Sequence, residues 1–196
     1  MKNMLKGILS ISLFTLVACN FQKKDNQKPD ENRFTPVVLT AEGDFDEPMS
    51  FEVMKDGKVY VSERKGNLKV FDPITKMVSI VGTIPVNTKY TSAEGVVSEA
   101  EEGFMGFTVD PNFEKNHFAY LYYAHPTETN HVLSRMEYKD EQLVLNSEKV
   151  MLNVPVQREE CCHTGGGMVF DKSGNLFLTV GNNTSNSNSD GYAPID

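Results

Sequence analysis

The fold of this 196-residue chain is decided by residues 51–71, which read FEVMKDGKVYVSERKGNLKVF. Short apolar runs in this stretch alternate with polar residues and are separated by Asp56-Gly57 and by Lys65-Gly66-Asn67. Because Gly, Asn and Asp tolerate positive φ angles, both interruptions predict tight turns between antiparallel strands. A further strand is expected over 78–84, after the turn at Asp72-Pro73. The pattern therefore predicts a four-stranded antiparallel meander.

The same unit returns twice along the chain. Its expected strands are residues 106–109, 118–123, 132–138 and 149–154 in the second copy, and 167–170 and 176–180 in the third. A four-stranded unit that repeats at about 50 to 60 residues is typical of the blades of a β-propeller. We therefore expect an all-β fold that contains the first two to three blades of a propeller. A β-sandwich, which also has many short strands, is the alternative.

A closed propeller typically needs about 4 to 8 blades, more than this chain offers. We therefore expect residues 36–196 to be the truncated N-terminal part of a longer propeller, with the polar run 182–190 as a surface loop. A small β domain with a ragged end is the alternative.

The first residues have the pattern of a processing segment. Lys2 and Lys6 precede an apolar run over 7–18, which is shorter than the about 20 residues that span a bilayer. The run ends in Leu16-Val17-Ala18-Cys19, which resembles the lipobox of bacterial lipoproteins. We expect a signal peptide over 1–19, with lipidation of Cys19 as the anchor. An ordinary secretory signal is the alternative.

The segment that follows the signal predicts a tether. Residues 20–35 are mostly polar and charged and lack apolar periodicity, so we expect them to be disordered. From the signal and its lipobox we expect the protein in the bacterial cell envelope, where disulfides are permitted. The formal net charge of −8 argues against nucleic acid as a partner, because phosphate binding needs clustered Lys and Arg.

His163 is the main candidate for chemistry. It lies directly before Gly165-Gly166-Gly167, on a turn that leads into an expected strand. The unperturbed pKa of histidine lets it accept a proton near neutral pH, and a loop on a rigid sheet can position it. The sequence therefore predicts a general base at His163.

Three stretches in this order resemble the glucose/sorbosone dehydrogenase family. They are residues 56–66 (DGKVYVSERKG), 101–113 (EEGFMGFTVDPNF) and 163–170 (HTGGGMVF), the last followed by the family's pattern over 171–182. The resemblance covers about residues 53–196. It implies a six-bladed propeller enzyme that oxidises aldose sugars with pyrroloquinoline quinone (PQQ), and many members are periplasmic or secreted.

The resemblance also implies roles for two residues. His163 matches the family's catalytic base, which takes the proton of the sugar's C1 hydroxyl while hydride passes to PQQ. Glu101 falls where the family has a Gln or an acidic residue near sugar and quinone. The alternative interpretation is that Glu101 is a solvated carboxylate on a loop, without a role in the site. The residues that hold PQQ and Ca²⁺ in the family lie in later blades, so this chain alone should be inactive. The full-length enzyme would pass electrons to a further acceptor.

Two adjacent cysteines depart from the family's pattern. Cys162 stands where characterised sugar dehydrogenases often have Asp, and Cys161 precedes it. The pair can form a vicinal disulfide, remain as thiols, or bind a soft metal with His163, although the spacing does not suit a metal site. The missing Asp, which could orient the imidazole, leaves the substrate in doubt. Since fold does not fix function, a non-catalytic envelope propeller that binds glycan or a protein partner is the alternative function.

The remaining histidines and the central tyrosines are expected to have structural roles. His117, His125 and His131 are expected at the surface, in loops or at strand ends. The tyrosines Tyr120, Tyr122 and Tyr123 are expected to pack within the second blade.

Overall fold

The computed structural model describes residues 31–182. The chain divides into two units, Met1–Val37 and Val38–Asp196. In the first unit the described residues contain one 3-10 turn, η1 (Glu31–Arg33). The predicted signal peptide 1–19 with its Cys19, most of the predicted tether 20–35, and all of the predicted loop 182–190 except its first residue lie outside the described residues. Among residues 31–182, no helix has the length and apolar character needed to cross a bilayer.

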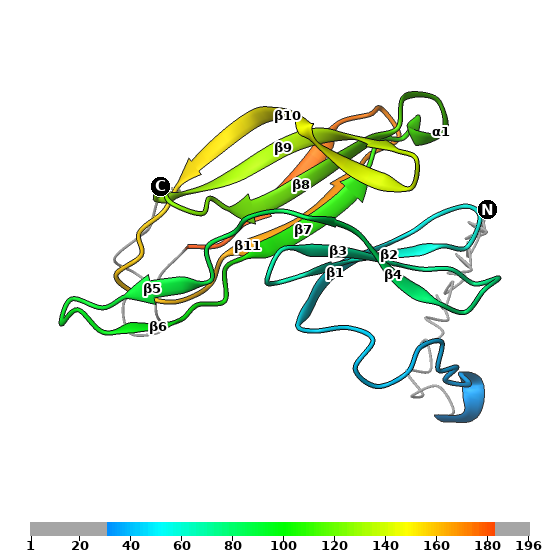
Figure 1. Ribbon diagram of the computed structural model, residues 1–196, viewed down its shortest axis with the longest axis horizontal. Coiled ribbons are helices and arrows are strands. Elements are labelled where there is room, and N and C mark those ends of the chain that lie inside the picture. The colour runs from blue at the N-terminus through cyan, green and yellow to red at the C-terminus, as the bar shows by residue number, and fades with distance from the viewer. Residues whose placement is uncertain (1–30, 183–196) are drawn as a thin grey trace, which may run out of the picture. The chain divides into compact units, whose positions relative to one another are not determined.

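The first sheet of the second unit is the predicted meander. Its strands are β1 (Pro48–Val53), β2 (Val59–Glu63), β3 (Asn67–Phe71) and β4 (Val78–Thr83), antiparallel and in the order β1-β2-β3-β4 (Figure 1). Gly57 has φ 85° and donates its N–H to the carbonyl of Met54 at 2.9 Å. The Asp56-Gly57 turn therefore forms as its sequence predicts.

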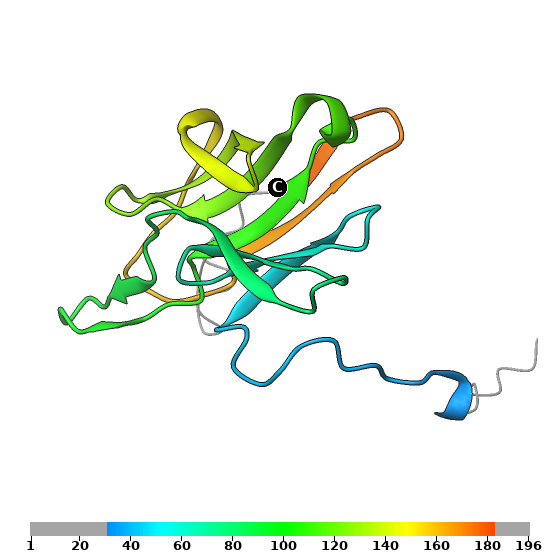
Figure 2. The same ribbon diagram turned by 45° about the vertical axis from the view of Figure 1, so that its right-hand side comes forward.

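The second sheet repeats this plan. Its strands are β7 (Phe104–Val109), β8 (Phe118–Ala124), β9 (Asn130–Lys139) and β10 (Gln142–Pro155), again paired in chain order. The turn between β7 and β8 contains a single helical turn, α1 (Phe113–Asn116). The connection from the first sheet to the second forms a hairpin that the sequence pattern did not predict, β5 (Lys89–Thr91) with β6 (Val97–Glu99). This hairpin projects away from both sheets in Figure 2.

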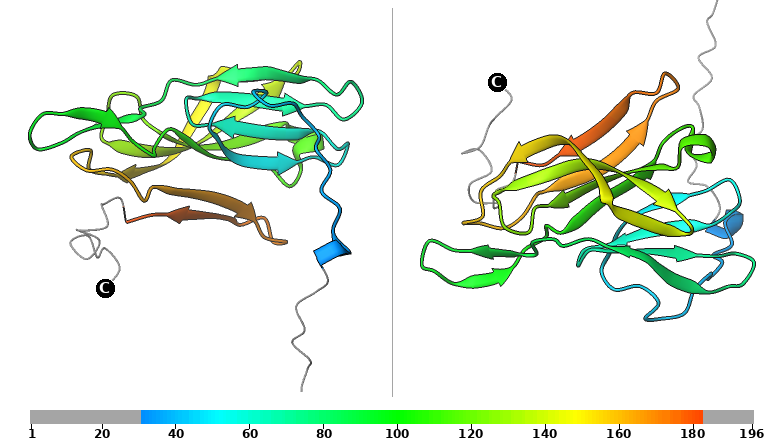
Figure 3. Two further views of the ribbon diagram at one scale, coloured as in Figure 1. Left: turned by 90° about the horizontal axis from the view of Figure 1, so that it is seen from below. Right: turned by 45° about the horizontal axis from the view of Figure 1, so that its top comes forward.

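A third sheet begins with the hairpin of β11 (Gly165–Phe170) and β12 (Leu176–Val180). It forms a separate layer beside the second sheet in Figure 3. The first strands of the three sheets are neighbours, since β7 lies against β1 on one side and against β11 on the other. Consecutive antiparallel meanders that meet through their first strands are the blades of a β-propeller. The predicted all-β partial propeller is therefore confirmed.

The second sheet is buried on both faces, which fixes the position of β7. Phe104 and Phe107 pack into the core shared with the first sheet, whereas Met105 packs toward the third. In a regular strand Phe104 and Phe107, three residues apart, would face opposite sides of the sheet. The register shift between Phe104 and Gly106 lets both side chains face the same core. A Cβ at Gly106 would collide with the carbonyl oxygen of Gly166, so glycine allows β7 and β11 to approach closely.

Candidate active site

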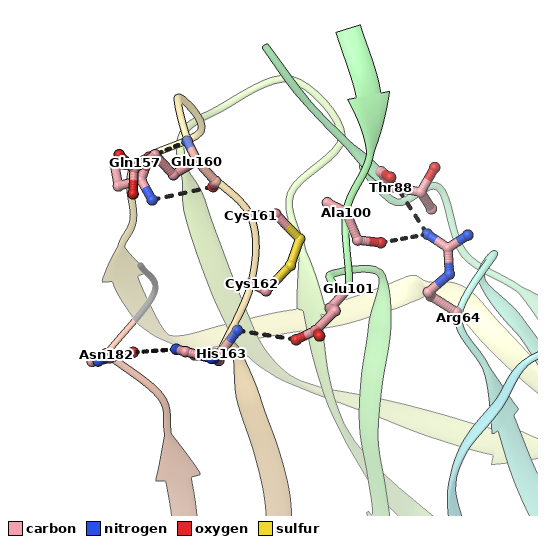
Figure 4. Close-up of a disulfide and its surroundings, with 10 residues drawn as sticks. All are labelled: Arg64, Thr88, Ala100, Glu101, Gln157, Glu160, Cys161, Cys162, His163 and Asn182. Atoms are coloured by element: carbon pink, nitrogen blue, oxygen red, sulfur yellow. Dashed lines mark hydrogen bonds between the residues drawn. A yellow bond between two sulfur atoms is a disulfide. The ribbon is translucent and has the colours of Figure 1, made fainter. Parts of the chain in front are cut away.

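Three chain segments meet at one end of β7 and β11. Glu101 lies just before β7, His163 lies two residues before β11, and Asn182 lies two residues after β12. Because β11 and β12 pair antiparallel, the residue after β12 returns to the residues before β11. Figure 4 shows the three side chains converging there.

The two residues to which the sequence analysis assigned chemistry are in direct contact. The backbone N–H of His163 donates a hydrogen bond to Oε2 of Glu101 at 3.0 Å. His163 has φ 58°, a left-handed conformation that is uncommon outside glycine. The Glu101 carboxylate therefore anchors the backbone of His163, a contact that no local sequence pattern indicates.

The imidazole of His163 has its own partner, Asn182. Nδ1 of His163 lies 3.1 Å from Oδ1 of Asn182. Since an amide oxygen only accepts hydrogen bonds, this contact is a hydrogen bond in the tautomer that carries the proton on Nδ1. In the neutral ring this leaves the lone pair on Nε2, which is the arrangement that a general base requires. Asn182 had no predicted role, although the Gly181-Asn182 pair that ends the family's pattern over 171–182 was an available signal.

A disulfide joins Cys161 to Cys162 directly before His163 (Figure 4). In this state neither sulfur offers a thiolate to a metal ion. Across residues 31–182, no three His, Cys, Asp or Glu side chains are grouped so that they could hold a metal ion. The structure therefore gives no support to the soft-metal alternative for this pair.

Beside the site lies a buried carboxylate, Glu102. Its Oε2 lies 2.7 Å from Nε2 of His131, and its Oε1 accepts a hydrogen bond from Nδ2 of Asn87. Nε of Arg158 lies 2.9 Å from the same Oε1, close enough to pair as charges, although its N–H does not point at the carboxylate. Nδ1 of His131 lies 3.2 Å from the hydroxyl of Tyr122, whose pKa is raised by burial and by the charge of Glu102.

The expectation that His131 lies at the surface is wrong. Its exposed fraction is 1 %, because β9 is an inner strand of the second sheet and Glu102 provides a buried partner. His117 is exposed, as expected, and His125 is partly buried. Tyr122 is fully buried, in agreement with its predicted packing role.

Arg158 ties the segment that carries His163 to the second sheet. Its guanidinium Nη2 donates to the carbonyl of His125 at 2.8 Å, and its own carbonyl accepts from the N–H of Thr91 at 2.8 Å. Arg64, on the other side of Glu101 and Glu102, pairs with Glu47 and Glu99. Both arginines that flank the site are therefore committed to protein carboxylates.

A hollow of about 350 Å³ lies at the opposite ends of β1, β7 and β11. Three of its carboxylates are already engaged: Glu52 accepts from the hydroxyl of Thr108 at 2.8 Å, and the carboxylates of Asp110 and Asp171 accept backbone N–H groups of their own turns. Because these groups serve the fold, the convergence around His163 is the better candidate for chemistry.

Comparison with known proteins gives a family match for most of the chain. The sequence model of the family described as Glucose / Sorbosone dehydrogenase matches residues 45–193. No curated protein matches the sequence.

Several solved structures share the fold. An oxidoreductase named as a glucose dehydrogenase from Thermus thermophilus superposes with TM-score 0.59 at 22 % identity, over 70 % of this chain and 38 % of that one. A PQQ-bound aldose sugar dehydrogenase from Streptomyces coelicolor superposes with TM-score 0.58 at 20 % identity, over 74 % of this chain and 41 % of that one. The apo form of a soluble aldose sugar dehydrogenase from Escherichia coli superposes with TM-score 0.61 at 18 % identity, over 78 % of this chain and 42 % of that one. This chain thus spans about two fifths of each structure.

Proposed function

Because this chain belongs to the glucose/sorbosone dehydrogenase family, we propose that it forms part of a PQQ-dependent aldose dehydrogenase in which His163 is the general base. The observation that carries the proposal is the hydrogen bond from Nδ1 of His163 to Oδ1 of Asn182. It fixes the tautomer whose Nε2 lone pair can take a proton. The imidazole lies at the end of a sheet strand and not within the core, so a substrate can approach it.

In this proposal Nε2 of His163 removes the proton of the C1 hydroxyl of an aldose. Loss of that proton makes C1 a better hydride donor, because the developing alkoxide pushes electron density toward the departing hydride. Glu101 holds the backbone of the base. Since a carboxylate offers about four acceptor positions, Glu101 can also receive a sugar hydroxyl while Oε2 keeps the N–H of His163.

When bound, PQQ supplies the hydride acceptor of such a reaction. The described residues fit the proton-transfer side of the site. The two arginines that flank the site, Arg64 and Arg158, each already pair with a protein carboxylate. We therefore assign the binding of PQQ and of Ca²⁺ to other parts of the full-length protein, and assign to this chain the handling of the sugar and its proton.

We also propose that the protein is held in the bacterial cell envelope by a lipid on Cys19. The proposal rests on the lipobox-like residues 16–19 and on the polar segment that follows them. An envelope location fits a disulfide at Cys161-Cys162, because such compartments permit disulfides. Electrons would leave the enzyme through a membrane or soluble acceptor.

The experiment that tests the function uses the full-length protein. It is loaded with PQQ and Ca²⁺, and reduction of an artificial electron-accepting dye is followed with a panel of aldoses. Aldose-dependent dye reduction that disappears without PQQ supports the proposal. A protein that binds PQQ but reduces no dye with any aldose would contradict it. Residues 20–196 alone are expected to show no turnover.

A further inference from the structure

The segment before His163 is restrained in an unusual way. A disulfide between the adjacent residues Cys161 and Cys162 closes a small ring around their peptide bond. The backbone has φ 135° at Cys162, whose N–Cα bond is part of the ring, and φ 58° at His163, the next residue; both values lie in the region that L-residues rarely adopt. Such conformations persist only where the surrounding structure holds them, and they cluster at functional sites.

Hydrogen bonds hold this segment on both sides of the ring. Before it, Oε1 of Gln157 accepts the N–H groups of Glu159 and Glu160, each at 2.8 Å. After it, the N–H of His163 reaches Glu101, and the carbonyl of Thr164 accepts the N–H of Gly181 at 3.2 Å. The disulfide is thus the covalent restraint between two hydrogen-bonded anchors (Figure 4).

The close approach of Gly181 to the backbone of His163 leaves little room for His163 to move. A Cβ placed on Gly181 would collide with the carbonyl oxygen of His163, so the backbones of these two residues are already in close contact. Gly181 is followed by Asn182, the partner of the imidazole. A change of φ at His163 would therefore alter both its backbone bond to Glu101 and its side-chain bond to Asn182.

We propose that the Cys161–Cys162 disulfide is a positioning element for His163; this inference rests on the proposed function of that histidine as the base. The ring holds the left-handed backbone that directs the N–H of His163 at Glu101 and its Nδ1 at Asn182. Opening the ring frees the peptide between the cysteines, lets φ relax, and loosens both bonds. The imidazole then loses its fixed tautomer, and the Nε2 lone pair is no longer held toward the substrate.

The disulfide is also within reach of reagents. Cys161 and Cys162 are both partly exposed, whereas the neighbouring Glu102 is buried. A water-soluble phosphine can therefore open the bond in the folded protein. The phosphine takes an oxygen from water and becomes a phosphine oxide, and its two electrons and the two protons of the water convert the disulfide to two thiols.

The test uses full-length protein with ¹⁵N-labelled histidine. The protein also carries Cys19→Ser, so that Cys161 and Cys162 are the remaining cysteines of residues 1–196. It is treated with the phosphine, desalted under argon, and compared with untreated protein. The mass of the peptide containing residues 161–162 reports the redox state. The ¹⁵N shifts of the His163 ring, assigned from their absence in His163→Asn, report the tautomer without cofactor or sugar.

We expect the untreated protein to contain the disulfide and to show a single His163 tautomer with the proton on Nδ1. After reduction the ring shifts should move to those of mixed tautomers. With PQQ, Ca²⁺ and an aldose, kcat should fall about tenfold or more while KM stays within about twofold, since misplacing a base weakens the chemical step. Reoxidation with a diazene oxidant should restore both the Nδ1–H tautomer in the ¹⁵N spectrum and the original kcat.

The double variant Cys161→Ser/Cys162→Ser is the matched control, because the phosphine has no bond to open in it. It should resemble the reduced protein before and after treatment, and each single variant should equal the double. Free thiols in untreated protein, or a reduced protein that keeps the Nδ1–H tautomer and full kcat, would overturn the proposal. If the tautomer changes but no redox state oxidises sugar, the positioning role stands and the proposed function fails.

Discussion

Oε2 of Glu101 accepts a hydrogen bond from the backbone N–H of His163, joining two residues that are 62 positions apart in the chain. The contact crosses from the segment before β7 to the segment before β11, so it exists because the second and third sheets pack through their first strands. It gives Glu101 a defined role even before any substrate is considered. The proposed chemistry depends on this contact and on the bond between His163 and Asn182.

Replacing Glu101 should separate hydrogen bonding from charge. In Glu101→Ala the N–H of His163 loses its acceptor, and kcat for aldose-dependent dye reduction should fall about tenfold, the cost of one hydrogen bond to a charged group. In Glu101→Gln the amide oxygen can still accept, so kcat should stay within about threefold. Glu128→Ala, at an exposed turn of the second sheet, is the control and should leave kcat unchanged. Equal kcat values for Glu101→Ala and the native protein would contradict the assignment.

Asn182 is expected to set the tautomer of the base. Asn182→Ala removes the acceptor of Nδ1–H, so kcat should fall about tenfold as the tautomers mix. Asn182→Asp retains an oxygen acceptor and should preserve the Nδ1–H tautomer in the ¹⁵N spectrum of His163. The spectrum is the primary measurement because it needs no cofactor. If Asn182→Ala shows an unchanged tautomer, the bond between His163 and Asn182 does not control the ring.

Glu102 should matter for stability more than an exposed carboxylate does. Glu102→Ala removes a buried carboxylate that pairs with the buried His131 and with the partly buried Asn87 and Arg158. It should lower the free energy of unfolding by about 3–5 kcal/mol. Glu141→Ala breaks the Lys58–Glu141 pair, whose carboxylate side chain is 78 % exposed, and should cost at most about 1 kcal/mol. Urea unfolding of both variants measures the difference. Similar losses would show that the Glu102 cluster is not a buried ion-pair network.

Asp171 should make the stability of the third sheet depend on pH. Hydrogen bonds from the side chain and backbone of Asn175, and from other N–H groups of its turn, lower the pKa of Asp171 below 3.8. Its stabilising contribution is therefore fully present above about pH 4 and is lost as the pH falls through the lowered pKa.

Asp171→Asn should remove this component, so the stability difference between native protein and variant should shrink on acidification. Urea unfolding across the acid range tests this, together with an NMR titration of the carboxyl carbon. A midpoint for Asp171 at or above its ordinary value would contradict the expectation.

Most of the strand order could be predicted because the signals are local. Asp56-Gly57 and Lys65-Gly66-Asn67 define turns within a few residues, and the strands beside them alternate in hydrophobicity. The β5–β6 hairpin escaped prediction because its strands, Lys89–Thr91 and Val97–Glu99, are short and lack an apolar run. Their pairing is specified by neighbours, such as the bond from the N–H of Thr91 to the carbonyl of Arg158.

The site was harder to predict than the fold, because its contacts are not local. The motif around His163 marked the base, and the family resemblance marked Glu101, but neither indicated that one holds the backbone of the other. His131 was expected at the surface because no neighbouring residue in the sequence indicates a buried partner. Its partner in the fold is Glu102, which lies 29 positions away. Asn182 becomes a partner of His163 only through the pairing of β11 with β12.

The most direct test of the central claim compares His163→Asn with His117→Asn in the full-length, PQQ-loaded protein. Both histidines have left-handed backbones, with φ 58° and 54°, and asparagine tolerates that region, so the two variants carry the same conformational cost. The measurement is kcat for aldose-dependent dye reduction. We predict a loss of about 10²–10⁴-fold in His163→Asn and none in His117→Asn, as expected for removal of a general base. Equal activity in the two variants would contradict the account.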